Sequence, residues 1–121
     1  YFFTNVKRHG ALLAKGRMLG IQFDTLFTDE LYFKISRHAI AMATRIRSIF
    51  EKHGITIAYD SPTNQQFVVL SPTLYEALSQ KVAFEIWERK SEHEIICRFV
   101  TSWATKEEEL DELDRILQAY A

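Results

Sequence analysis

The chain has 121 residues, of which 47% are hydrophobic and 26% charged, and its formal net charge is −1. This composition is that of an ordinary globular domain and excludes collagen-like, low-complexity and strongly disordered proteins. The length suits one domain, and no apolar run reaches the roughly 20 residues that cross a bilayer. The lone cysteine, Cys97, can form no intrachain disulfide, which is typical of a protein in a reducing cytoplasm.

Charge is distributed unevenly along the chain. Residues 1–59 carry a net charge of +5, whereas residues 60–121 carry −6. The first 20 residues contain four basic residues and no acid, and aliphatic residues such as Leu12 and Leu13 alternate with them. A nucleic-acid-binding segment is usually more basic and interleaved with aromatic residues. The pattern therefore favours a helix that packs on protein, and we expect no nucleic-acid partner.

The N-terminal third of the chain is predicted to be helical. A first long helix runs from about Asn5 to Phe27 and includes glycines that each cost about 1 kcal/mol in a helix interior. These glycines suggest close helix contacts or a bend near Gly20. A second helix begins at Thr28 or Asp29, has apolar residues spaced by three and four, and ends in basic residues before Gly54.

After Gly54 the spacing of apolar residues changes to alternation, which predicts strands. The further elements, in order, are strands at 55–59 and 66–70, a helix at 72–80 capped by Ser71, strands at 82–87 and 94–101, and a terminal helix whose capping box is Thr105–Glu108. The predicted fold class is therefore α+β: a small antiparallel sheet of about four strands covered by helices, in the order α-α-β-β-α-β-β-α.

Few side chains in the sequence suggest catalysis. The four histidines have no metal-ligand spacing relative to one another or to Cys97, so we expect no metal site. No glycine-rich phosphate loop is present. Cys97 lies between apolar residues of a predicted strand and is interpreted as a small buried hydrophobe. His38 is interpreted as structural, and His53 as a favourable charge at a helix C-terminus.

Arg98 is the exception, because it lies in an apolar strand, on the same face as Ile96 and Val100. A guanidinium in such a place needs an anion, since an unpaired buried charge is costly. One interpretation is an ion pair with Glu85 across the predicted hairpin. The other is the bidentate binding of a substrate carboxylate, for which arginine has the right geometry.

Several segments, in the right order along nearly the whole chain, resemble one enzyme family. They are Lys7–Arg17, Gln22–Phe23, Leu31–Phe33, Asp60–Phe67 and Arg98–Trp103. Together they resemble low-specificity threonine aldolases and, more broadly, the β-eliminating-lyase group of pyridoxal-phosphate enzymes.

The resemblance implies a domain of the aspartate-aminotransferase type of fold. Residues 1–121 would form its C-terminal small domain, with an interdomain-type helix at 1–27 and the α+β part at 28–121. The chain opens at Tyr1 without an initiator methionine, and we expect the large cofactor-binding domain to precede it. The lysine that forms the Schiff base would then also lie before Tyr1, so this chain is expected to hold no catalytic residue and to be inactive by itself.

The resemblance also implies residue roles. Arg98 matches the position that binds the α-carboxylate of the amino-acid substrate, and Lys7 matches a basic position near the cofactor, pyridoxal phosphate. The implied reaction of the full-length enzyme is cleavage of threonine or allo-threonine to glycine and an aldehyde. Where a common aldolase pattern has a histidine, this sequence has Ser102-Trp103, which leaves β-elimination open beside aldol cleavage.

The expected partners are an amino acid, the large domain and further copies of the full-length enzyme, with no membrane. The basic half is expected to face a phosphate-bearing neighbour. Two other classes of function stay open at this point. One is an autonomous α+β ligand-binding or regulatory domain without catalysis, and the other is a helical interaction module that docks through residues 5–50.

Overall fold

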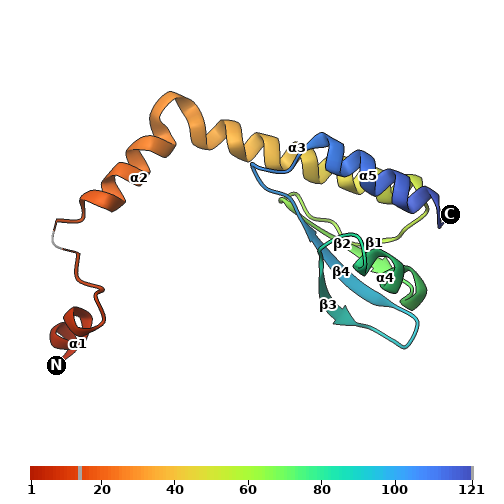
Figure 1. Ribbon diagram of the computed structural model, residues 1–121, viewed down its shortest axis with the longest axis horizontal. Helices are drawn as coiled ribbons and strands as arrows, with labels where there is room; N and C mark the ends of the chain where they lie inside the picture. Colours follow the sequence, from red (N-terminus) through yellow and green to blue (C-terminus); the bar gives the residue numbers. More distant parts are fainter. Residues whose placement is uncertain (14, 121) are drawn as a thin grey trace. The chain divides into compact units, whose positions relative to one another are not determined.

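Four antiparallel strands form one sheet in the order β1-β2-β4-β3 in the computed structural model (Figure 1), which describes residues 1–13 and 15–120. The strands are β1 (Ile57–Tyr59), β2 (Gln65–Leu70), β3 (Glu85–Arg89) and β4 (Ile95–Val100). The two longest strands, β2 and β4, pair at the centre of the sheet, and six consecutive residue pairs are in register. β3 and β4 form the predicted hairpin.

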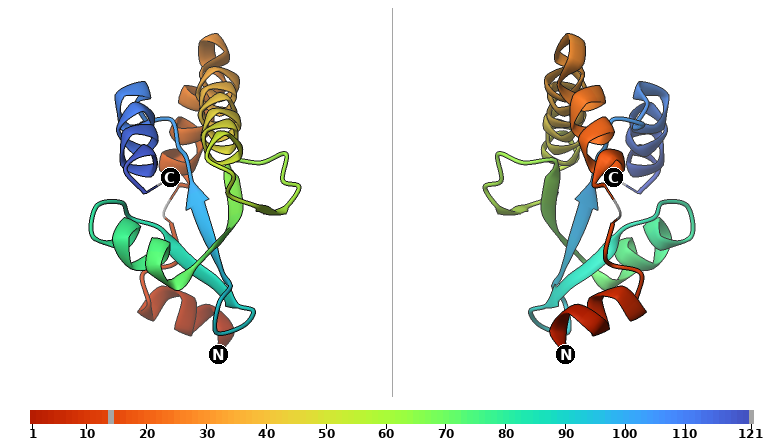
Figure 2. Two further views of the ribbon diagram at one scale, coloured as in Figure 1. Left: turned by 90° about the vertical axis from the view of Figure 1, so that its right-hand side faces the viewer. Right: turned by 90° about the vertical axis from the view of Figure 1, so that its left-hand side faces the viewer.

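Three helices pack on one face of this sheet. They are α3 (Leu31–Lys52), α4 (Pro72–Ser79) and α5 (Glu107–Gln118). Figure 2 shows α3 and α5 side by side over the sheet. The predicted α+β class, with its four-stranded antiparallel sheet and its order of elements, is confirmed.

The hydrophobic core lies between these helices and the sheet. Alternate residues of β2 and β4 point into it, and Val68 and Cys97 lie opposite each other in register with no exposed surface. The rings of Phe50 on α3 and Phe99 on β4 contact edge-to-face at 4.8 Å between centroids. Burial raises the pKa of the Cys97 thiol to about 11. Cys97 is therefore the buried hydrophobe that its strand position predicts.

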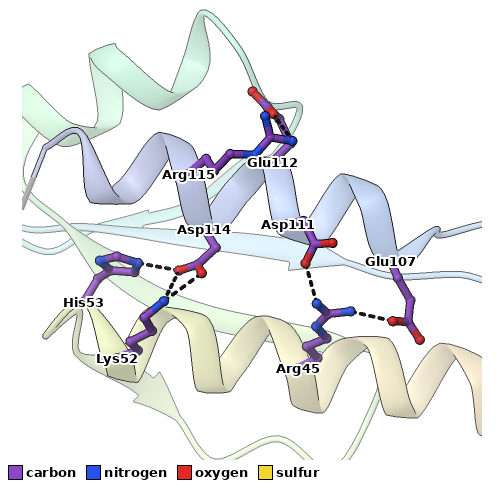
Figure 3. Close-up of polar contacts among 8 residues, drawn as sticks. All are labelled: Arg45, Lys52, His53, Glu107, Asp111, Glu112, Asp114 and Arg115. Carbon is purple, nitrogen blue, oxygen red and sulfur yellow. Dashed lines mark hydrogen bonds and ion pairs between the residues drawn. The ribbon is translucent and has the colours of Figure 1, made fainter.

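Polar contacts join α3 to α5 along their exposed edges (Figure 3). Asp114 of α5 accepts hydrogen bonds from Lys52 Nζ at 2.7 Å and from His53 Nε2 at 2.6 Å. About two turns before Lys52 on α3, Arg45 donates to both Glu107 and Asp111 of α5. His53 thus has a specific carboxylate partner in addition to its place at the end of α3.

The helix boundaries follow from local capping. α3 ends two residues before Gly54, whose φ of +71° is the left-handed conformation that terminates helices. At α4, the Ser71 hydroxyl accepts from the Leu74 amide, and Pro72 occupies the first turn, as predicted. α5 begins one residue later than predicted. Its capping contact is the Lys106 amide donating to Glu109 Oε2 at 2.9 Å, because Thr105 instead accepts a hydrogen bond from the Ser102 amide.

Residues Tyr1–Phe33 and Lys34–Ala121 form two separate units. In the first, the helix expected over 5–27 is divided into α1 (Phe2–Arg8) and α2 (Arg17–Phe27), and the single turn η1 (Thr28–Glu30) leads into α3. The division falls at Gly10 and Gly16, whose φ values of +67° and +61° lie outside the helical region. Gly20, where a bend was expected, lies inside α2. In the described residues, no helix has the length and apolarity to cross a membrane.

Candidate functional site

The face of the sheet opposite the core carries the side chains that point to function. Tyr59, Phe67 and Trp87, from β1, β2 and β3, form a row of edge-to-face aromatic contacts, with centroid distances of 5.6 and 5.2 Å. Glu88 accepts a hydrogen bond from the Tyr59 hydroxyl at 3.3 Å. Desolvation and the Glu88 charge both raise the pKa of Tyr59. Arg98 on β4, the strand between β2 and β3, contacts this row at the Trp87 ring.

Three neighbours hold the Arg98 guanidinium. It lies over the Trp87 ring, 5.3 Å from the centroid, which is a favourable cation–π geometry. Its Nη1 donates to Gln65 Oε1 at 3.2 Å, and its Nη2 donates to Glu85 Oε2 in an ion pair. Its Nε is buried and has no hydrogen-bond partner among the described residues. The guanidinium is therefore oriented by two neutral groups, Gln65 and Trp87, and paired with one carboxylate, Glu85.

Strand register explains why these residues meet. Arg98 lies opposite Glu85 on β3 and opposite Phe67 on β2. The ion pair that the sequence suggested as the structural role of Arg98 is thus present. The sequence does not predict the contacts of Gln65 and Trp87 with Arg98, because they depend on the pairing of β2 with β4 and on the register shift in β3 between Ile86 and Glu88.

A pocket of about 280 Å³ adjoins the guanidinium. Its lining residues are Ala83, Phe84, Glu85, Arg98 and Val100. The Arg98 side chain is 26% exposed, whereas that of Glu85 is 67% exposed. The cation is thus half enclosed at the wall of an open pocket, while its carboxylate partner extends from an edge strand into solvent.

The other predicted site residues belong to other elements of the chain. Lys7, the weaker candidate, belongs to α1 in the first unit, where its ammonium lies 5.7 Å from the centre of the Phe3 ring. Ser102-Trp103 lies in the connection between β4 and α5, and the Trp103 side chain is exposed. His38 is structural, as predicted, since its Nε2 lies 2.8 Å from the Thr105 carbonyl oxygen, which ties α3 to the same connection.

The chemistry available at Arg98 is the binding of an anion. A guanidinium whose two terminal nitrogens donate to an amide and a carboxylate suits the carboxylate of a ligand, which can accept hydrogen bonds from the same two nitrogens. The described neighbours of Arg98 include no further cation that would favour a phosphate group. The site thus fits the carboxylate of a small substrate, whereas a phosphate-bearing cofactor needs additional donors.

Comparison with known proteins supports the resemblance seen in the sequence. No family model matches the chain, and no curated protein matches it. Among solved structures, the chain is similar to a threonine aldolase from Leishmania major, with 36% sequence identity and a TM-score of 0.86. The match covers 95% of this chain but 34% of that one, so this chain spans about a third of the length of the aldolase. The resemblance to threonine aldolases is confirmed.

Proposed function

We propose that this chain is the C-terminal domain of a pyridoxal-phosphate-dependent lyase that cleaves β-hydroxy amino acids such as threonine or allo-threonine to glycine and an aldehyde. The similarity to a threonine aldolase along 95% of the chain supports this assignment. The observation that carries it is the placement of Arg98 on the open face of the sheet, beside a pocket and already paired with a carboxylate.

The proposed role of Arg98 is to bind and orient the α-carboxylate of the amino acid. Pyridoxal phosphate, when bound, supplies an electron-accepting ring that allows a bond at the α-carbon to break. Which bond breaks depends on which one is held perpendicular to that ring, so a fixed carboxylate contributes by positioning. Trp87 and Gln65 would keep the guanidinium in place, because neither carries a charge that competes with the substrate.

Most of the cofactor site is proposed to lie in the large domain outside this chain. Lys7 is the one contribution assigned here, as a cation near the cofactor. α1 and α2 contain no buried residue, and they expose large apolar side chains: Phe2, Phe3, Met18, Leu19, Ile21, Phe23 and Phe27. Exposed apolar surface of this kind marks an interaction site, and we assign it to packing against the large domain. The isolated chain would be inactive, and the full-length enzyme would be an oligomer.

Substitution of Arg98 in the full-length enzyme tests the assignment. Charge-assisted hydrogen bonds contribute about 1.5–3 kcal/mol each, so Arg98→Ala should raise the amino-acid KM by about a hundredfold or more. Arg98→Lys, which keeps the charge but loses the planar fork, should lie between Arg98→Ala and the wild type. The visible absorbance of the bound cofactor should persist in both variants.

The matched control is Arg89→Ala, which removes the exposed arginine at the end of β3, 5.9 Å from the Tyr75 ring. This variant should leave the kinetics unchanged. Unaltered kinetics in Arg98→Ala would contradict the proposed role of Arg98 while leaving the similarity to threonine aldolases intact.

A further inference from the structure

Glu85 occupies the position that the proposed substrate carboxylate needs. Its carboxylate accepts from Nη2 of Arg98 and lines the same pocket. The Nε of Arg98 is buried, so a substrate carboxylate that takes two parallel hydrogen bonds from the guanidinium would use its two terminal nitrogens, one of which is Nη2. Glu85 therefore competes with the substrate, in contrast to the neutral groups at Gln65 and Trp87.

The two sides of the ion pair differ in how firmly they are held. Arg98 lies on a central strand, between β2 and β3, and has contacts from both. Glu85 lies on the edge strand β3, where every residue is exposed. An exposed carboxylate on an edge strand can rotate into water at little cost in free energy. Moving the Arg98 side chain costs more, because it would break the contacts with Gln65 and Trp87 as well. On displacement, Glu85 is the partner that moves.

We infer that Glu85 is an internal carboxylate that pairs with Arg98 in the empty enzyme and is displaced by the carboxylate of the substrate. When no substrate is present, the pair neutralises the charge of the guanidinium and keeps it oriented. Because the substrate must displace Glu85, its apparent affinity for the enzyme is weaker. This inference rests on the proposed function of Arg98. It adds a residue that sets affinity for the amino acid without touching the reacting bond.

The test is Glu85→Gln in the full-length enzyme, with Glu88→Gln as the matched control. Both residues lie on β3, but Glu88 contacts the Tyr59 hydroxyl. Exposed ion pairs are worth little, so removing the competition should lower the Kd of glycine and the KM of the amino acid by about two- to fivefold. The kcat should stay at the wild-type value, and Glu88→Gln should behave as the wild type.

A ligand without a carboxylate shows whether Glu85→Gln acts by removing a competitor of the substrate carboxylate or by changing the net charge of the site. Ethanolamine, in place of glycine, offers an amine but no carboxylate, so its binding should be the same in Glu85→Gln and the wild type. Equal tightening of glycine and ethanolamine would overturn the inference, and so would unchanged or weaker glycine binding. Glycine binding to Arg98→Ala distinguishes the two proposals. If Arg98→Ala weakens it and Glu85→Gln does not change it, only the inference about Glu85 fails.

Discussion

Thr101, the residue that follows β4, joins the strand of Arg98 to the rest of the second unit. Its side chain is 1% exposed, and its hydroxyl donates to the Ala39 carbonyl of α3 at 2.7 Å. The Asn64 side chain, just before β2, donates to the Thr101 carbonyl at 2.7 Å. These two contacts fix the end of β4 against both a helix and the neighbouring strand, three residues beyond the guanidinium that we propose binds substrate.

Replacing Thr101 by valine should destabilise the protein without changing the size of the side chain. The substitution removes the hydroxyl and leaves the Ala39 carbonyl without this buried donor, a loss of about 1–3 kcal/mol. Urea unfolding of the chain measures the change in free energy. Thr73→Val, at an exposed position of α4, is the control and should alter stability by less than about 0.5 kcal/mol. Equal effects of the two substitutions would show that the buried hydroxyl contributes nothing.

At the scale of elements, the α3, α4 and α5 helices differ from the strands in how much of their formation is local. α4 is the clearest case. The Ser71 hydroxyl accepts from the Leu74 amide, and Pro72 has its backbone preset for a first helical turn. Both features are neighbours in sequence, and the predicted start of the helix is confirmed. The pairing of the strands depends instead on partners that are distant in the sequence, such as Phe67 opposite Arg98.

Ser71→Ala should remove the cap of α4 and cost about 1 kcal/mol of stability, because the Leu74 amide loses its acceptor. Leu78 on α4 is fully buried in the core, so fraying of this helix should lower the free energy of unfolding of the whole second unit. The control is Ser79→Ala, at the last residue of α4, where the hydroxyl donates to the Glu76 carbonyl of its own helix. Thermal or urea unfolding should show a smaller change for Ser79→Ala, and a larger one would refute the capping role.

At the scale of the whole second unit, the pairing of α3 with α5 depends on charge as well as on the apolar core. Asp114 receives hydrogen bonds from both Lys52 and His53 (Figure 3), and these two contacts lower its pKa. A carboxylate with a lowered folded pKa stabilises the fold above its unfolded pKa and loses that contribution as pH falls through the folded pKa. The affected range therefore lies below the ordinary value of 3.8.

Asp114→Asn should consequently lower stability at neutral pH and reduce the further loss of stability on acidification below about pH 4. The free energy of unfolding, measured from urea transitions between pH 2 and 7, provides this comparison. Glu112→Gln is the matched control on the same helix, since Glu112 pairs with Arg115 of α5 itself and does not link α5 to α3. If the free energy of unfolding falls as steeply below pH 4 in Asp114→Asn as in the wild type, this carboxylate is not a source of the pH dependence.

The sequence alone determined the features that depend on near neighbours. The extent of α3 to Lys52, the Ser71 cap and the burial of Cys97 all follow from spacings of a few residues. The pairing of Arg98 with Glu85 across the hairpin was one of the two interpretations that the sequence left open for this arginine. Helical periodicity, capping and hairpin register are local properties, so they can be read without the fold.

The tertiary structure decided the rest. It places β2 beside β4, brings Gln65 and Trp87 to Arg98, ties Thr101 to α3, and divides the N-terminal helix at its glycines. Pairing between strands that are not consecutive closes a long loop, and many registers satisfy the same alternation of apolar residues. The packing of α3, α4 and α5 on one face of the sheet favours the register that turns the apolar residues of β2 and β4 toward these helices, and Arg98 lies on the other face.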